Sequence, residues 1–300
     1  MNVVPPLLSN EYLDGYRGRI GAFNGFNDRR QVRSFISLHD PSGMLQANTK
    51  RTFVESVAIV NSRCISDIVM EHTLWPLLSA IGRPTTQEGI ESIARHQAAT
   101  ATFSRRARNG LWLCPSCIEV DLKTRYFTYW RRSHQMPGRH SCQEHGTRLR
   151  VVNAVSLMVD SPDEVLHRAK QIDESLFKEI QQSRLARRFE EFMDEVLEKK
   201  IVFEYSSCIS KLKLAICPAG ESIDPKLPLE RFLRRLEKSL SVSWLDWLRP
   251  DISPGVGHLA PFFSAWTVTN SACFSINSLA IIANTIFPSA DEAIHALRKG

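Results

Sequence analysis

Four residues with the spacing of metal ligands constrain this chain more than any other feature. Cys114 and Cys117 are separated by two residues, Cys142 and His145 are separated by two residues, and 24 residues lie between the two pairs. Two ligands at this spacing can reach one ion from a single turn of chain, and two such turns complete a tetrahedron. Four protein ligands leave no position for water, so the pattern predicts a structural Zn²⁺ site rather than a catalytic one.

The fourth ligand has competitors, because His134 and His140 lie between the two pairs. We favour His145 because its spacing from Cys142 repeats the spacing of the first pair. The Cys-Pro-Ser-Cys sequence predicts a tight turn, and the aromatic and β-branched residues at 125–130 favour a strand. In so small a segment, metal binding is expected to supply much of the local folding energy.

Positive charge is concentrated around this block. Residues 101–150 contain ten lysines and arginines and three acidic residues, which gives +7, whereas the whole chain has a formal charge of +6. Such a patch favours a polyanion such as DNA, and a solvated basic face is an alternative of equal weight. For Arg131 and Arg132, an acidic protein surface is the competing partner. The residues that we expect to contact nucleic acid or a partner are Arg125, Arg131, Arg132, Arg139 and Arg148.

The periodicity of apolar residues predicts a mainly α-helical fold. Helices are expected at 52–60, 65–78, 87–106, 161–180, 185–196, 229–240, 275–287 and 291–297, whereas residues 15–48, rich in Gly, Asn, Asp and Ser, are expected to form loops. We divide the chain into an N-terminal helical part over 1–110, a zinc-binding module over 111–150 and a C-terminal helical domain over 151–300.

The cysteine content and the absence of long apolar runs bear on the compartment. Residues 1–10 have no basic region followed by an apolar core, so we expect no secretory signal. The sequence contains no run of 18 apolar residues, so we expect no membrane span. In a reducing cytosol, paired cysteines bind metal more often than one another. We therefore expect a cytoplasmic protein.

Other chemistry finds little support in the sequence. There is no glycine-rich phosphate loop, no Gly-x-Ser-x-Gly and no His-Glu-x-x-His, so we expect a protein that is not an enzyme. Cys208, Cys217, His258 and Cys273 are spaced too irregularly to predict a second metal site. Buried free thiols explain these cysteines better.

Three segments of the block resemble the TniQ/TnsD family of transposon target selectors. They are Leu111–Cys117, with its Cys-Pro-x-Cys sequence, Tyr129–Gly138, which reads Tyr-Trp-Arg-Arg-x-His-Gln-x-Pro-Gly, and Cys142–Leu149, with Cys-x-x-His-Gly. A fourth, His72–Pro76, is similar to a short stretch of the same family. The resemblance covers residues 1–150.

The resemblance implies a bacterial, non-catalytic adaptor for transposition. Family members recognise a target as DNA or through an RNA-guided CRISPR effector, and they recruit an AAA+ ATPase regulator that brings the transposase. It implies Cys114, Cys117, Cys142 and His145 as zinc ligands, helix-turn-helix elements, for which 204–250 is the candidate region, and a homodimer in some members. Two alternatives stay open: a protein–protein scaffold without direct DNA contact, and a zinc-dependent, DNA-binding transcription regulator.

Overall fold

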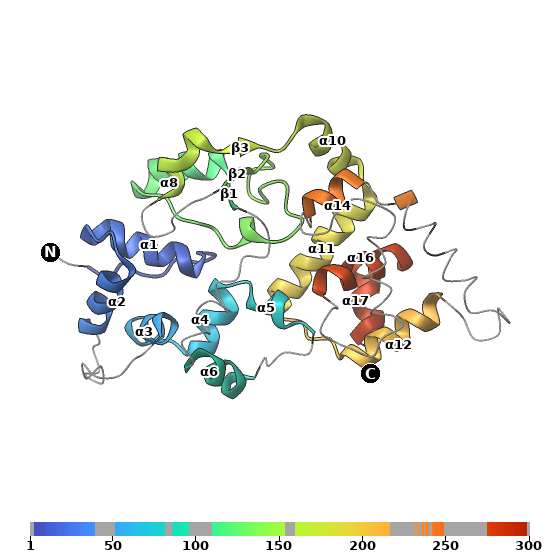
Figure 1. Cartoon of the computed structure of the whole chain (residues 1–300), viewed down its shortest axis with the longest axis horizontal. Coiled ribbons are helices and arrows are strands. Elements are labelled where there is room, and N and C mark those ends of the chain that lie inside the picture. The colour runs from blue at the N-terminus through green and yellow to red at the C-terminus, as the bar shows by residue number, and fades with distance from the viewer. Residues whose placement is uncertain are drawn as a thin grey trace. The chain divides into compact units, whose positions relative to one another are not determined.

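The computed structural model describes residues 3–39, 52–81, 86–95, 110–153, 160–216, 242–248 and 275–298, together with positions 232, 234, 236, 238 and 239. The chain divides into two compact units, the first formed by 1–75 with 84–172 and the second by 76–83 with 173–300. It is mainly helical, as the sequence predicted (Figure 1). The predicted division at 110 and 150 stays a prediction, although both sides of position 110 lie in the first unit.

The first unit combines short helices with one small sheet. Its helical elements are α1 (Leu13–Asn24), α2 (Arg29–Leu38), α3 (Phe53–Val60), α4 (Ile65–His72), α6 (Gln87–Arg95), α8 (Pro115–Arg125), α9 (Pro162–Val165) and the 3₁₀ turns η1 (Ser133–Gln135) and η2 (Leu166–Arg168). Short α5 (Trp75–Ser79) begins where the first unit passes into the second. The predicted continuation of α6 to 106 lies outside the described residues.

The prediction of loops over 15–48 was wrong for its described part, because α1 and α2 form there. Tyr12, Tyr16 and Ile20 recur at helical spacing and are at most 1% exposed, so one side of α1 is a core face despite its glycines. Gly25 ends the helix with φ +69°. The side chain of Asp28 caps α2 by accepting a hydrogen bond from the backbone N–H of Arg30.

The predicted helix over 161–180 is interrupted, and that prediction was also wrong. Strand β3 (Lys170–Gln171) separates η2 from α10 (Glu174–Gln182), and Asp173 caps α10 by accepting from the backbone N–H groups of Ser175 and Leu176. Strand pairing of β3 and the side-chain cap of α10 therefore divide a segment whose continuous apolar stripe had predicted one helix. The predicted helix over 65–78 is divided in the same way, because Thr73 Oγ1 accepts from the backbone N–H of Trp75.

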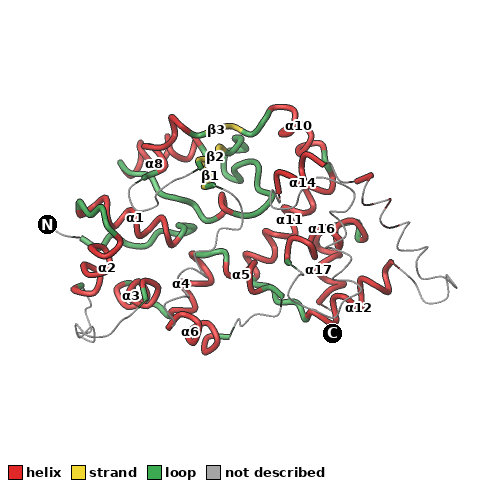
Figure 2. Tube along the Cα trace, viewed as in Figure 1, coloured by secondary structure: helices red, strands yellow, loops and turns green. Residues whose placement is uncertain are grey.

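Three short antiparallel strands form the sheet. Strands β1 (Leu111–Leu113) and β2 (Arg150–Val152) pair with Leu111 opposite Val152, and β2 pairs with β3. Between β1 and β2 the chain is largely loop and turn, apart from α8 and η1 (Figure 2). The sheet thus brings together the two ends of the segment that contains all four predicted ligands.

Backbone hydrogen bonds join the start of the chain to the segment around η1. The N–H of Tyr12 donates to the carbonyl oxygen of Trp130 at 2.7 Å, and the N–H of Arg132 donates to that of Asn10 at 2.7 Å. The Asn10 carboxamide continues the contact by accepting from the N–H of Ser133 at 3.0 Å. The N-terminal helices and the predicted metal segment therefore share one hydrogen-bonded connection.

His72 supports the same connection from α4. Its Nδ1–H donates to the carbonyl oxygen of Glu11 at 3.0 Å, and its Nε2 lies 3.1 Å from Arg63 Nη1. Burial lowers the pKa of His72 to about 4, so the ring is neutral at neutral pH and Nε2 accepts from the guanidinium. The His72–Pro76 stretch noted in the sequence thus has a structural role.

The second unit is built around α11 (Arg184–Lys199), whose apolar face packs on α16 (Ile276–Ile286) and α17 (Ala290–Arg298) (Figure 1). Phe189, Phe192 and Val196 form this face and are fully buried. Helices α12 (Tyr205–Ile216) and α14 (Val242–Leu248) pack nearby, on α17 and α10 respectively. The predicted pair of final helices is confirmed. No helix among the described residues is long and apolar enough to cross a bilayer.

Gly15 tests the close packing between α1 and Trp130. A Cβ at this position would lie 2.7 Å from Cβ of Trp130. We predict that Gly15→Ala lowers the free energy of unfolding by about 1–3 kcal/mol through overpacking, measured by urea denaturation. Helix propensity alone would predict stabilisation by about 0.5–1 kcal/mol instead.

The control is Ala22→Gly, at an exposed position near the end of the same helix. It should cost about 1 kcal/mol, because it changes propensity without any clash. A Gly15→Ala protein that is more stable than the parent would show that α1 and Trp130 do not pack as described.

Candidate metal centre

The four predicted ligands come from two short elements that the sheet brings together. Cys114 follows β1 and is the N-cap of α8, and Cys117 lies in the first turn of that helix. Cys142 and His145 lie in a turn that is closed by hydrogen bonds from the N–H of Gly146 to Cys142 O and from the N–H of Cys142 to Thr147 O, each 2.8 Å. Each element therefore contributes two ligands from one turn.

Two local predictions for this segment were wrong. Cys114–Cys117 begins a helix instead of forming an isolated tight turn, because Pro115 at the first helical position has a backbone angle already suited to the helix. Residues 125–130 form no strand: α8 continues to Arg125, and Tyr126 ends it with φ +64°. Phe127, Tyr129 and Trp130 make side-chain contacts here instead of strand pairs, whereas Tyr126 is exposed.

The ligand atoms form a compact cluster in which all lie within 4.8 Å of one another. The sulfurs of Cys117 and Cys142 are 3.5 Å apart, and Nδ1 of His145 lies 3.9, 3.3 and 3.5 Å from the sulfurs of Cys114, Cys117 and Cys142. In a zinc tetrahedron, the corresponding edges are ~3.8 Å for two sulfurs and ~3.6 Å for sulfur and nitrogen. The donor set therefore fits one tetrahedral metal ion.

The electrostatics of the three thiols also fit a cation. Hydrogen bonds from Cys117 and Cys142 lower the pKa of the Cys114 thiol to about 2, whereas the pKa of Cys117 is raised because its hydrogen bonds to Cys114 and Cys142 favour the protonated form. Ionising all three thiols would place three negative charges within 4.8 Å of one another. A divalent cation offsets that repulsion, as it does in structural Cys₃His sites.

The structure distinguishes the three candidate histidines. His145 is exposed and presents Nδ1 to all three sulfurs, whereas His134 is 4% exposed and its Nε2 lies 3.9 Å from the Cys117 sulfur. His140 is outside the cluster, and its carbonyl oxygen accepts from the N–H of Leu149. His145 thus completes the donor set, and His134 is placed to hydrogen-bond a coordinating sulfur from outside it.

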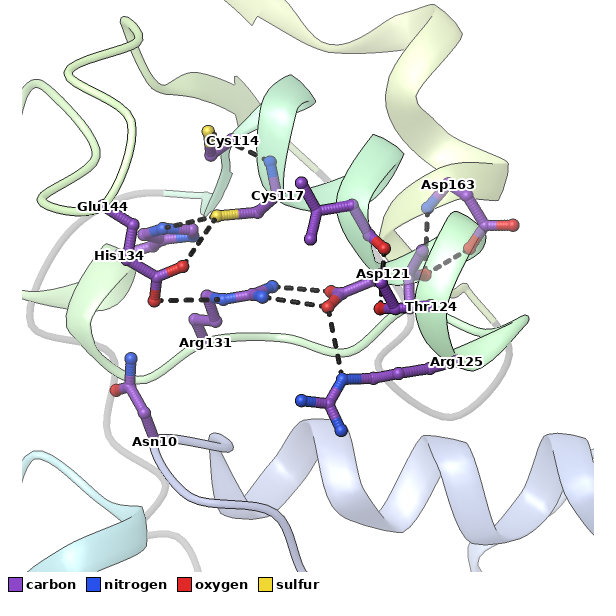
Figure 3. Close-up of polar contacts among 12 residues, drawn as sticks. Asn10, Cys114, Cys117, Asp121, Thr124, Arg125, Arg131, His134, Glu144 and Asp163 are labelled. Carbon is purple, nitrogen blue, oxygen red and sulfur yellow. Dashed lines mark hydrogen bonds and ion pairs between the residues drawn. The ribbon is translucent and has the colours of Figure 1, made fainter.

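Arg131 connects the cluster to α8. Its Nη1 and Nη2 donate to the two carboxylate oxygens of Asp121 at 2.7 and 3.0 Å, and its Nε lies 3.8 Å from Glu144 (Figure 3). Its guanidinium also lies over the ring of Tyr129, 4.3 Å from the centroid. Arg131 and Asp121 are 6% and 2% exposed, so this bidentate pair is largely removed from water.

The other candidate arginines differ in what they present to solvent. Arg139 is 4% exposed, Arg132 donates to the carbonyl oxygen of Met70 at 2.7 Å, and Arg148 donates to that of Ile172 at 3.2 Å. The side chain of Arg125 is 47% exposed and lies 3.7 Å from Asp121. Arg131 and Arg139 are poorly placed to reach a phosphate, whereas Arg125 is accessible.

Sequence reasoning missed two residues that hold the site. Asp121 lies one helical turn after Cys117, and that i, i+4 spacing was the available signal for a residue on the ligand-bearing face. Gln135 exchanges two hydrogen bonds with the backbone of Trp112, at 3.0 and 2.8 Å, and so ties η1 to β1. Nothing in the sequence pattern pointed to this pairing.

No second group of three or more metal-binding side chains occurs in the described part of the chain. Cys208 is buried beside the carbonyl oxygen of Leu297, and burial raises its pKa to about 11. It behaves as a buried thiol, as predicted. Cys217, His258 and Cys273 lie outside the described residues.

Comparison with known protein families gives a match that includes this site. The TniQ family model matches residues 3–149, which include the N-terminal helices and all four cluster residues. The protein belongs to the TniQ family. No curated protein sequence gives a significant match. Membership of the TniQ family associates the protein with transposition and agrees with a non-catalytic role, and the Cys₃His cluster of this TniQ domain could hold a metal ion.

The buried pair in the TniQ domain yields a stability prediction. Arg131→Ala should lower the free energy of unfolding by about 3–5 kcal/mol, because it leaves the Asp121 carboxylate buried without its bidentate partner. Urea denaturation followed by circular dichroism measures the loss.

Arg125→Ala is the matched control, because it removes a second arginine from the same carboxylate. Its side chain is 47% exposed, so its removal should cost less than about 1 kcal/mol. Equal losses for the two variants would contradict the structural role assigned to Arg131.

Proposed function

We propose that this TniQ protein is a target-selection adaptor of a bacterial transposition system. It recruits an AAA+ ATPase regulator, and through that regulator a transposase, to a chosen target. The observation that carries the proposal is the match over residues 3–149, within which the described residues form a four-ligand cluster instead of a catalytic constellation. We place the protein in the cytoplasm, where thiols stay reduced and available to metal.

Cys114, Cys117, Cys142 and His145 bind one Zn²⁺ in this proposal. When bound, zinc supplies a cross-link between the start of α8 and the turn at 141–148. Around it, His134 is placed to hydrogen-bond Cys117, and Arg131 brings positive charge towards the sulfurs. The chain's own residues thus orient the ligands and neutralise part of their charge.

Two routes to the target remain, and the charges of the TniQ domain bear on them. In the first, the protein binds target DNA directly, and the exposed guanidinium of Arg125 is the best-placed of the five arginines. In the second, it is a scaffold that receives its target from a partner such as an RNA-guided CRISPR effector. Burial of Arg131 and Arg139 favours the second route, because both guanidinium groups serve internal contacts.

The second unit is proposed to contribute further partner contacts. The region proposed for a helix-turn-helix, 204–250, includes α12 and α14, and most of the chain between them lies outside the described residues. A homodimer would present two TniQ domains to one ATPase assembly. These proposals rest on the family relationship.

Metal content tests the zinc site. Elemental analysis of the purified protein should give one zinc per chain, and Cys142→Ser should reduce this value by at least half at equal protein concentration, because three ligands hold zinc less tightly than four. Cys208→Ser is the matched control and should retain the full content. A parent protein without zinc, or a Cys142→Ser protein with its full content, would refute the assigned ligands.

A salt series distinguishes direct DNA binding from the scaffold. If about six phosphates are contacted, the affinity for duplex DNA should fall roughly a thousandfold between about 50 and 200 mM salt. For the scaffold, we expect no measurable duplex binding at either salt concentration, together with capture of the purified ATPase regulator. Failure to bind both DNA and the regulator would contradict the adaptor role altogether.

A further inference from the structure

A cavity of about 160 Å³ opens beside α1 in the first unit, lined by that helix, the chain following α8 and the start of α9. A water molecule occupies about 30 Å³, and a cavity of roughly 150 Å³ holds a benzene ring. The cavity therefore admits one planar side-chain group. It lies apart from the Cys₃His cluster, because none of the four ligand residues lines it.

Aromatic rings make up much of the wall. They belong to Phe23, Tyr126, Phe127, Tyr129 and Trp130. Phe23 and Phe127 meet edge to face with centroids 5.3 Å apart, and Arg131 and a hydrogen bond from Trp130 Nε1 to Asp160 O hold the neighbouring rings. These contacts hold Phe23, Phe127, Tyr129 and Trp130 in the wall of the cavity, whereas Tyr126 is exposed at its edge.

Tyr126 combines an unfavourable backbone conformation with high exposure to solvent. Its φ of +64° is a left-handed conformation that disfavours any residue with a Cβ, and the residue is 88% exposed. Glycine or asparagine is the usual residue at such a helix end. Strain of this kind at a highly exposed aromatic residue points to a role outside the fold.

The charges of the lining favour a cation. Arg19 is neutralised by a bidentate contact with Glu11, and Asp160 is paired with Arg168 at 3.0 Å. Asp163 accepts a hydrogen bond from the Thr128 hydroxyl, and no lysine or arginine among the described residues pairs with it. One uncompensated carboxylate beside several π faces attracts a positive group and repels phosphate.

The same rings already bind one guanidinium. The Cζ atom of Arg19 lies 5.1 Å from the centroid of Phe127 and 6.0 Å from that of Phe23. This internal contact shows that the geometry of these rings suits a planar cation. A cation inside the cavity would also meet Tyr126 and Asp163, which line it.

We propose that this cavity is a docking pocket for an arginine side chain of a partner protein, presented beside apolar residues that cover Phe23 and Tyr126. The identity of that partner as a transposition protein rests on the adaptor role proposed above. The pocket itself does not, because it is defined by its rings and its carboxylate. It gives the adaptor a contact surface that reads protein and not DNA.

Fluorine NMR of the full chain labelled with 3-fluorotyrosine tests the pocket, since the protein contains five tyrosines. The probe is the capped peptide acetyl-Leu-Arg-Leu-amide, and its control is the same peptide with neutral, isosteric citrulline in place of arginine. We expect the arginine peptide to shift the Tyr126 resonance and to bind roughly tenfold more tightly than the citrulline peptide. Equal binding of the two peptides would overturn the proposal, as would a Tyr126 shift on addition of duplex DNA alone.

Two variants separate the pocket from general electrostatics. Asp163→Asn should weaken the arginine peptide severalfold and leave the citrulline peptide unchanged. Glu164→Gln removes a carboxylate charge one residue away, at a position outside the cavity lining, and should leave the affinity for both peptides unchanged. If the two variants weakened binding of the arginine peptide equally, the pocket would be refuted. Tyr126→Gly should abolish binding of the arginine peptide without lowering the melting temperature of the protein. Saturation-transfer NMR measures the binding in this variant. If the arginine peptide did not bind while the protein kept its zinc and captured the regulator, the pocket would be refuted and the proposed adaptor function would stand.

Discussion

Three cysteine sulfurs and one imidazole nitrogen lie within 4.8 Å of one another, and the arrangement of the TniQ domain around them depends on that closeness. The strands on either side of the cluster are three residues long or shorter, and much of the chain between them is loop and turn. Outside α8, few regular backbone hydrogen bonds stabilise such a segment, although Trp112, Trp130 and Leu149 are buried in it. A metal ion that joins the start of α8 to the turn at 141–148 would supply the missing cross-link.

The cluster is tied to the rest of the first unit through the residues that separate its two halves. Trp130 and Arg132 pair with the backbone of Tyr12 and Asn10, while Arg131 between them pairs with Asp121 on α8. The segment containing Trp130, Arg131 and Arg132, whose basic and aromatic residues suggest a binding surface, therefore serves largely as an internal connection. The exposed aromatic surface lies instead beside α1, where Tyr126 and Phe23 reach solvent.

The sequence was sufficient where the determining interactions are local. The four cluster residues could be predicted because ligand spacing is set by the geometry of a turn, and α16 and α17 because their apolar residues recur at helical spacing. It was insufficient where a tertiary contact decides. Glycine-rich α1 packs one face in the core, where Gly15 allows Trp130 to approach, and β3 interrupts an apolar stripe because β2 offers it a pairing edge. The burial of Arg131 depends on Asp121, ten residues away in the chain, and no composition or spacing shows that pairing.

Hydrogen exchange on the intact protein, before and after stoichiometric removal of zinc by a chelator, tests the central claim most directly. If the four residues hold one ion that stabilises the surrounding segment, amides of 111–152 should lose at least a hundredfold of protection, whereas those of α11 and α16 in the second unit should keep theirs. Unchanged protection over 111–152 after complete removal of the metal would contradict the account, because the segment would then fold without the cross-link.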